Sequence, residues 1–257
     1  MPRENVRWFS PRLLSRLKEA ASSNTVIISA LAGFGKTTAG EYIWKELLPK
    51  RAPKFWHSCL DGSALSEWKR FCETVRKIDA LAGDGLLSLG PPDRRTSGDA
   101  ASMLSDISRA EETWLFIDDF HKFVHSGIDV AAWGGFWRRE AENLHVVVMT
   151  RHFGDETPRG CPGVAWLDYG DLALEPAGIR AFFDLHGVKL KEREEFTVHK
   201  YTLGNVMGAW LEINEYIETG KFRRLDDEVS YHDIMRQPCY VSLTDEQRDF
   251  MLHVSPF

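Results

Sequence analysis

Several features common in other protein classes are missing from this chain of 257 residues. It has only four cysteines and no Cys-x-x-Cys pair, so we expect neither a zinc site nor a disulfide framework, but reduced and mostly buried thiols. No apolar run is long enough to cross a membrane, and the first residues lack the apolar stretch of a signal peptide. We therefore expect a cytoplasmic protein with no membrane partner.

The chain also lacks an excess of positive charge. Lysine and arginine number 32 against 38 aspartates and glutamates, which gives a formal net charge of −6 and a pI of about 5.9. This balance argues against a nucleic-acid-binding surface spread over the whole chain, and it leaves room only for a local basic patch. What the chain does have is 43% hydrophobic residues, enough for the core of one large domain or two small ones.

Helix and strand patterns alternate over the first two-thirds of the chain. This alternation predicts an α/β fold with a parallel five-stranded sheet flanked by helices. Glycines and a Gly-Pro-Pro-Asp stretch predict a surface loop at Ala82–Ser97. The predicted strands are Val26–Ala30, Lys54–Leu60, Thr113–Ile117, His145–Thr150 and Val164–Asp168.

From Leu174 onward the strand patterns stop and only helical patterns follow. A change of this kind predicts a small helical domain attached to the α/β domain. The last residues then open a new element, because Leu243–Glu246 combines a helix N-cap with acidic first-turn residues ahead of an apolar run. The predicted helices of the small domain are Pro176–Leu185, Glu192–Tyr201 and Val206–Tyr216.

The most informative segment is the strand, glycine turn and helix that surround Gly35-Lys36-Thr37. This layout is typical of a phosphate-binding P-loop, although Ala30 replaces the usual first glycine of the motif. Lys36 would reach the β- and γ-phosphates, and the Thr37 hydroxyl would hold Mg²⁺. A strand–turn–helix without a ligand is the competing interpretation. The residues expected to surround the phosphates are Ala32, Gly33, Phe34, Gly35, Lys36, Thr37 and Thr38.

A second candidate motif is the apolar strand that ends in Asp118 and Asp119. A parallel strand beside the P-loop strand would bring these carboxylates to the phosphates. Asp118 would hold Mg²⁺ through water, and Asp119 would orient the attacking water. A strand followed by an Asp-capped turn is the simpler alternative.

The next predicted strand ends in Arg151, where a cation can contact the γ-phosphate and report its presence. A solvated arginine is the alternative interpretation. Other conspicuous side chains are expected to serve the core rather than a site. They are His57, Trp133, Phe136 and Trp137.

Together these motifs resemble those of the MalT-type, LuxR-family regulators, which are signal-transduction ATPases with numerous domains (STAND). Asn205 departs from the family pattern, which usually has tryptophan there. The segments that carry the resemblance are Ala32–Thr38, Leu115–His121, Ser10–Leu17, Trp56–Asp61, Met149–Arg151, Asp171–Glu175, Gly204–Gly208 and Leu243–Leu252.

The resemblance implies an ATP- or ADP-binding module with Mg²⁺ that hydrolyses ATP slowly and switches between a closed ADP form and an open, oligomerising ATP form. It implies an inducer, either a small molecule or a protein, and places DNA binding in a domain that this chain does not contain. Arg12, at the end of Val6–Arg12, would contact adenine. The implied domains are a nucleotide-binding domain at 1–170, a helical lid at 171–222, and a linker with the incomplete start of a winged-helix domain at 223–257.

Two other ATP-using classes compete with the regulator. A P-loop kinase of a small molecule would need a mobile, arginine-containing lid, for which Arg94 and Arg95 in the predicted loop qualify. An AAA-type ATPase would need an arginine acting across a ring of subunits, and Arg138 or Arg139 fits that role.

Overall fold

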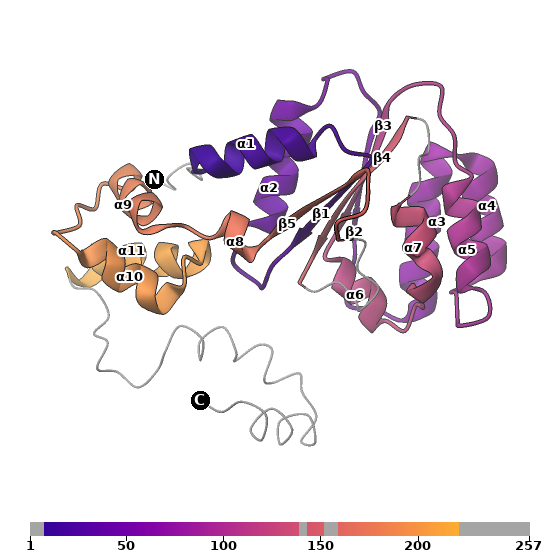
Figure 1. Cartoon of the computed structure of the whole chain (residues 1–257). Coiled ribbons are helices and arrows are strands. Elements are labelled where there is room, and N and C mark those ends of the chain that lie inside the picture. Colours follow the sequence, from indigo (N-terminus) through magenta and orange to yellow (C-terminus); the bar gives the residue numbers. More distant parts are fainter. Residues whose placement is uncertain (1–7, 139–142, 152–158, 221–257) are drawn as a thin grey trace. The chain divides into compact units, whose positions relative to one another are not determined.

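The computed structural model describes residues 8–138, 143–151 and 159–220 (Figure 1). The chain divides into two compact units. One comprises Phe9–Leu172, and the described residues of the other are Trp8 and 173–220. None of the helices in these ranges has both the length and the apolar character that a membrane span requires.

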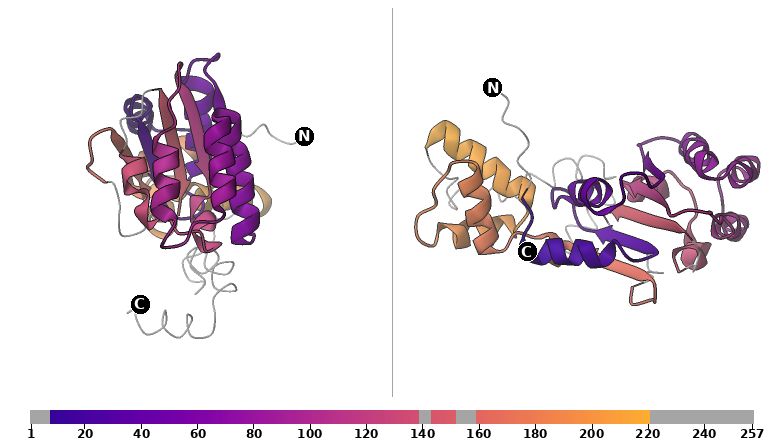
Figure 2. Two further views of the ribbon diagram at one scale, coloured as in Figure 1. Left: turned by 90° about the vertical axis from the view of Figure 1, so that its right-hand side faces the viewer. Right: turned by 90° about the horizontal axis from the view of Figure 1, so that it is seen from above.

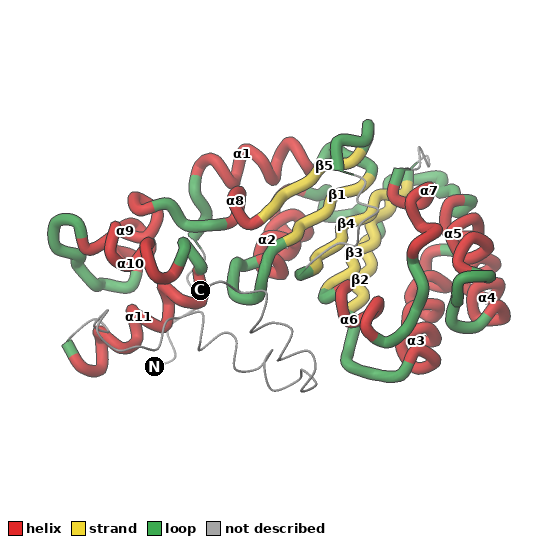
Figure 3. The backbone as a smooth tube through the Cα atoms, turned by 60° about the horizontal axis from the view of Figure 1, so that its bottom comes forward, coloured by secondary structure: helices red, strands yellow, loops and turns green. Residues whose placement is uncertain are grey.

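The larger unit is built on a parallel sheet of five strands, as predicted. The strand order is β2-β3-β4-β1-β5, which can be followed by the strand labels in Figure 3. The strands are β1 Thr25–Ser29, β2 Lys54–Ser58, β3 Thr113–Asp118, β4 Leu144–Thr150 and β5 Val164–Asp168.

This order corrects one expectation, because β3, which carries Asp118, does not lie beside β1. Strand β4 lies between them, pairing Thr150 with Ser29 on one side and Val148 with Ile117 on the other. Hydrophobic runs of similar length mark each strand but do not encode which strands are neighbours. The end of β4 is therefore the element between the P-loop and the aspartates.

Helices cover both faces of the sheet (Figures 1 and 2). One face carries α1 and α2, and α2 continues into a short π-helical turn at Ile43–Leu47. The other face carries α3 to α7 over a large apolar core. The helices of this unit are α1 Pro11–Ala20, α2 Lys36–Tyr42, α3 Ala64–Ile78, α4 Ala80–Leu89, α5 Ser97–Ser105, α6 Phe120–His125, α7 Gly134–Trp137 and α8 Tyr169–Leu172.

The aromatic residues expected in the core are there. Trp133, Phe136 and Trp137 are buried, and Trp133 packs among the aromatic rings of α3 and α6. His57 is also buried, with its Nδ1 3.3 Å from the Thr74 hydroxyl oxygen. These side chains therefore stabilise the sheet–helix interface rather than forming a surface site.

The prediction of a loop at Ala82–Ser97 is wrong over its first half, which is helix α4. The Asp79 side chain caps this helix by accepting a hydrogen bond from the Ala82 amide at 2.9 Å. Gly83 permits close helix packing, because a Cβ at this position would lie 2.5 Å from the Arg76 Cα. The glycine thus marks a close contact between α3 and α4 rather than a turn.

The described part of the second unit is helical, with its own apolar core. Its three helices are α9 Pro176–Leu185, α10 Glu194–Thr202 and α11 Val206–Thr219. Trp8 packs against α9, since a Cβ on Gly178 would lie 2.8 Å from the indole ring. The predicted start of a winged-helix domain at 223–257 lies outside the described residues.

Among the cysteines, Cys59 and Cys72 are buried free thiols and Cys161 is a half-buried free thiol. Burial raises the pKa of the Cys72 thiol to about 12, so it stays protonated at neutral pH. Burial, with nearby carboxylates, also raises the pKa of Cys59. Cys239 lies outside the described residues.

Candidate functional site

The turn between β1 and α2 has the backbone geometry of an anion-binding loop. Gly33 and Gly35 both adopt positive φ, 81° and 80°, which side chains other than glycine rarely adopt. Gly35 is the N-cap of α2, and a Cβ placed on it would meet no protein atom within 4 Å. The amides of Lys36, Thr37 and Thr38 open the helix and have no helical carbonyl to bond. Open space therefore lies next to a row of unsatisfied N–H groups.

Lys36 is a buried cation at this helix end, with 8% of its surface exposed. Its Nζ donates a hydrogen bond to the Leu31 carbonyl at 2.9 Å, within the same turn. Burial, together with the nearby charge of Arg151, lowers the pKa of Lys36 from 10.5 to about 8, against the opposing effect of Asp119 and Asp118. An anion bound in the turn would therefore stabilise the charged form of Lys36.

Thr37, in the first turn of α2, and Asp118, the last residue of β3, come together at one edge of the parallel sheet. The Thr37 hydroxyl lies 3.2 Å from both carboxylate oxygens of Asp118. Asp118 also accepts a hydrogen bond from the Asp119 amide at 3.0 Å. Burial and the neighbouring Asp119 nevertheless raise the pKa of Asp118. Hydroxyl and carboxylate oxygens of this kind are the ligands that Mg²⁺ prefers.

Asp119 lies directly after β3 in the left-handed conformation, with φ 56° and ψ 36°. Its carboxylate forms an ion pair with Lys122 at 3.0 Å, one turn along α6. Arg151 directly follows Thr150, the last residue of β4, which pairs with Ser29 at the end of β1 just before the P-loop. The structure thus gathers Lys36, Thr37, Asp118, Asp119 and Arg151 around the ends of β1, β4 and β3.

Arg12 lies apart from this group. It is a largely exposed residue of α1, and its Nη2 is 3.8 Å from the carboxylate of Asp171 on α8. Asp171 also accepts a hydrogen bond from Arg16 at 3.2 Å, so two arginines of α1 share one carboxylate. In the structure, Arg12 therefore contributes to an ion-pair cluster between α1 and α8. The contact of Arg12 with adenine stays a prediction.

Sequence reasoning passed over two side chains near the site. His121, on α6, is buried, and burial together with Arg151 lowers its pKa to about 4, so it is neutral at physiological pH. Tyr169, directly after β5, is 65% exposed, and its ring lies 6.4 Å from that of Phe34 in the P-loop. The sequence did contain one sign of their role. His121 and Tyr169 come soon after β3 and β5, whose ends lie at the same edge of the sheet as the P-loop.

The donor set fits a nucleotide bound with Mg²⁺. A buried lysine and free helix amides suit the phosphates, and the oxygens of Thr37 and Asp118 suit the metal. Together with the sheet order, this arrangement decides the fold class. The fold is that of a P-loop NTPase.

Solved structures support this fold assignment. The chain is similar to a STAND protein with a tetratricopeptide repeat sensor from Pyrococcus horikoshii, with a TM-score of 0.50 and 17% identity. The match covers 100% of this chain and 35% of that one, so this chain spans about a third of its length. No protein-family model matches the sequence, and no curated protein matches it.

Weaker structural matches fall among other ATPases. A Walker-type ATPase of Pyrococcus abyssi matches with a TM-score of 0.47 and 14% identity, over 86% of this chain and 70% of that one. A RuvB variant of Thermotoga maritima matches with a TM-score of 0.41 and 14% identity, over 80% and 60%.

Proposed function

We propose that this chain is an adenine-nucleotide-binding ATPase module and the switch of a MalT-type, LuxR-family transcriptional regulator. The observation that carries the proposal is the pairing of Thr37 with Asp118 next to the buried Lys36. Neither the hydroxyl–carboxylate pair nor the buried cation has an evident role in stabilising the fold alone. Both are accounted for by a Mg²⁺-bound triphosphate.

In this proposal each residue has a separate task. Lys36 and the amides of residues 33–38 bind the β- and γ-phosphates, while Thr37 and Asp118 hold the metal. A bound Mg²⁺ would neutralise charge on the phosphate oxygens. Asp119 orients the attacking water, and Arg151 contacts the γ-phosphate. Loss of the γ-phosphate on hydrolysis removes the contact that Arg151 makes only with ATP.

The switch follows from that difference between the two nucleotides. An ATP form and an ADP form exchange populations only if each nucleotide binds the two domain arrangements with different affinity, by a few kcal/mol. ADP would favour a closed form, and ATP with an unknown inducer would favour an open form that assembles into oligomers. Contact with DNA would belong to another part of the full protein.

For the kinase alternative, the first half of the segment proposed as a mobile lid is helix α4, and Arg94 and Arg95 lie in the turn between α4 and α5. For the AAA-type alternative, Arg138 donates to the Gly134 carbonyl at 3.0 Å, and Arg139 lies outside the described residues. We therefore retain the regulator as the proposal.

Titration calorimetry with Mg-ADP, Mg-ATP and Mg-GTP, followed by turnover assays, tests this function. The proposal predicts tight binding of adenine nucleotides and slow hydrolysis that needs no acceptor. Rapid turnover that depends on a small-molecule acceptor would establish a kinase instead. A ring-sized assembly with rapid hydrolysis would favour the AAA-type ATPase.

A further inference from the structure

Lys122 is placed to control the carboxylate of Asp119. Its Nζ lies 3.0 Å from the Asp119 carboxylate and 3.6 Å from that of Asp61, which is in the loop after β2. Its side chain is only 23% exposed, and Asp119 is the main cause that raises the pKa of Lys122. One ammonium group therefore bridges two carboxylates from different elements. One of the two, that of Asp119, is proposed above to orient the attacking water.

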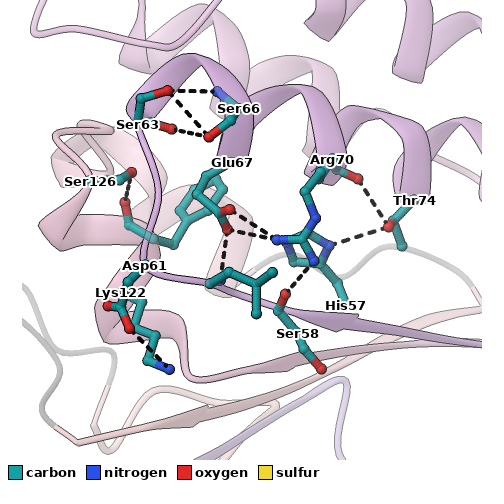
Figure 4. Close-up of polar contacts among 12 residues, drawn as sticks. His57, Ser58, Asp61, Ser63, Ser66, Glu67, Arg70, Thr74, Lys122 and Ser126 are labelled. Atoms are coloured by element: carbon teal, nitrogen blue, oxygen red, sulfur yellow. Dashed lines mark hydrogen bonds and ion pairs between the residues drawn. The ribbon is translucent and has the colours of Figure 1, made fainter.

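The loop that carries Asp61 is itself held in place (Figure 4). The Leu60 amide donates to the Glu67 carboxylate at 2.8 Å, and Glu67 is buried with 2% of its surface exposed. Arg70 pairs with that carboxylate at 2.9 Å and also donates to the Ser58 carbonyl at 2.9 Å. Because Glu67 and Arg70 fix the backbone on both sides of Cys59, the loop presents Asp61 to Lys122 from a defined position.

The backbone of Asp119 adds to this restraint. A left-handed conformation is unfavourable for a residue other than glycine, so the surrounding structure must maintain it in Asp119. In that conformation the Asp119 side chain forms no capping hydrogen bond with the first amides of α6. Its carboxylate forms the ion pair with Lys122 instead. The ion pair is therefore the interaction that fixes the carboxylate.

We propose that Lys122 is a positioning residue that holds the Asp119 carboxylate in an ion pair and thereby slows ATP hydrolysis at the P-loop. This inference rests on the proposed function. An ammonium group in contact with a carboxylate occupies one of its lone pairs and stabilises its anion, which weakens its attraction for a proton of water.

The step concerned is the attack of water on ATP. A bond forms between the water oxygen and the γ-phosphorus, while the bond from that phosphorus to the bridging oxygen of ADP breaks. The products are ADP, inorganic phosphate and a proton. The water loses this proton to solvent, while Asp119 orients the water by accepting a hydrogen bond from it. A carboxylate engaged by Lys122 is less available for that hydrogen bond, so the module keeps ATP for longer.

The test compares Lys122→Met with a matched control, Lys45→Met. Lys45 forms an ion pair of the same 3.0 Å length with Glu41, away from the aspartates. Mg-ATP affinity is measured by titration, and hydrolysis is followed under single-turnover conditions. We expect Lys122→Met to hydrolyse ATP about threefold to tenfold faster at unchanged affinity. Lys45→Met and the conservative Lys122→Arg should both match the wild type.

The affinity and the Lys122→Arg variant separate positioning from a general structural effect. Loss of the ammonium group should speed hydrolysis at unchanged Mg-ATP affinity, and Lys122→Arg, which keeps a cation beside Asp119, should restore the wild-type rate. An unchanged or slower rate with normal affinity would overturn the inference and leave the proposed function standing. If the wild-type chain binds no nucleotide, the proposed function fails and this inference fails with it.

Discussion

The Thr37 hydroxyl lies 3.2 Å from both carboxylate oxygens of Asp118, although the two residues are 81 positions apart in the chain. One belongs to the first turn of α2 and the other to the last residue of β3, with β4 between their strands. Such a contact brings together two oxygen ligands at the end of a glycine turn. In our account, this pair is the metal half of the nucleotide site.

Removal of the Thr37 hydroxyl should therefore weaken nucleotide binding only when Mg²⁺ is present. We expect Thr37→Val to reduce Mg-ATP affinity by about tenfold, which is 1.4 kcal/mol, and to leave binding in EDTA little changed. Thr38→Val is the comparison, because Thr38 is assigned to the phosphates and not to the metal, so any loss of affinity that it causes should not depend on Mg²⁺. Calorimetric titrations with and without Mg²⁺ measure both. Equal losses in the two conditions would show that Thr37 does not serve the metal.

Gly35→Ala should affect nucleotide binding more than it affects folding. The added methyl meets no protein atom within 4 Å, so the cost to stability is the positive φ, about 1 kcal/mol. The same methyl would enter the space assigned to phosphate, and affinity should fall at least tenfold. Gly220→Ala is the control, since Gly220 has a similar left-handed backbone and equally open space. Similar affinity of the two variants for ATP would contradict the placement of the phosphates.

The buried Lys36 predicts a pH dependence of stability in the absence of nucleotide. Its pKa is lowered from 10.5 to about 8 by folding, so between these values the unfolded chain binds a proton that the folded chain does not. The contribution of Lys36 to the free energy of unfolding should therefore decrease as pH falls from about 10.5 to 8 and stay constant below.

Lys36→Met removes this effect, so the nucleotide-free variant should be more stable than the wild type at neutral pH, by up to about 3 kcal/mol. Denaturant unfolding of both proteins at several pH values measures the difference in their free energy of unfolding. The contributions of the other titrating groups are the same in both proteins and cancel in this difference. A variant of equal or lower stability at pH 7 would show that the Lys36 cation is not under strain in the folded protein.

Arg151→Ala should change the choice between nucleotides. The account gives Arg151 a contact with the γ-phosphate alone, so ATP affinity should fall by about tenfold while ADP affinity stays near the wild-type value. Competition between the two nucleotides, measured with a fluorescent ADP analogue, gives the ratio directly. A parallel loss for both would place Arg151 on the α- or β-phosphate instead.

The sequence predicted the parts of this fold that depend on local pattern. All five strands and the P-loop turn were recognisable from β-branched runs and from the glycines around Lys36. The strand order was not, because the placement of β4 between β1 and β3 depends on crossovers that local pattern does not record. Helix α4 was missed for a similar reason, since Gly83 was interpreted as a turn residue when it serves contact with Arg76.

The candidate site divides in the same way. The sequence nominated Lys36, Thr37 and Asp118 through a known spacing, and the structure brings the last two into contact. It did not reveal Lys122, because an ion pair one helical turn beyond Asp119 has the appearance of an ordinary surface charge pair. Only the left-handed backbone of Asp119 and the approach of Asp61 make that contact distinctive.

The central claim is that Lys36 and its loop bind an adenine nucleotide. The most direct measurement is a melting scan of the wild type and Lys36→Ala, each with and without Mg-ADP or Mg-ATP at about a hundredfold excess over the dissociation constant. The account predicts stabilisation of the wild type by about 2.7 kcal/mol. This corresponds to a rise of about 5–10 °C in Tm, and the variant should show none. Nucleotide binding by Lys36 and its loop would be contradicted by a wild-type Tm that neither nucleotide changes. It would also be contradicted by a Tm rise in Lys36→Ala equal to that of the wild type.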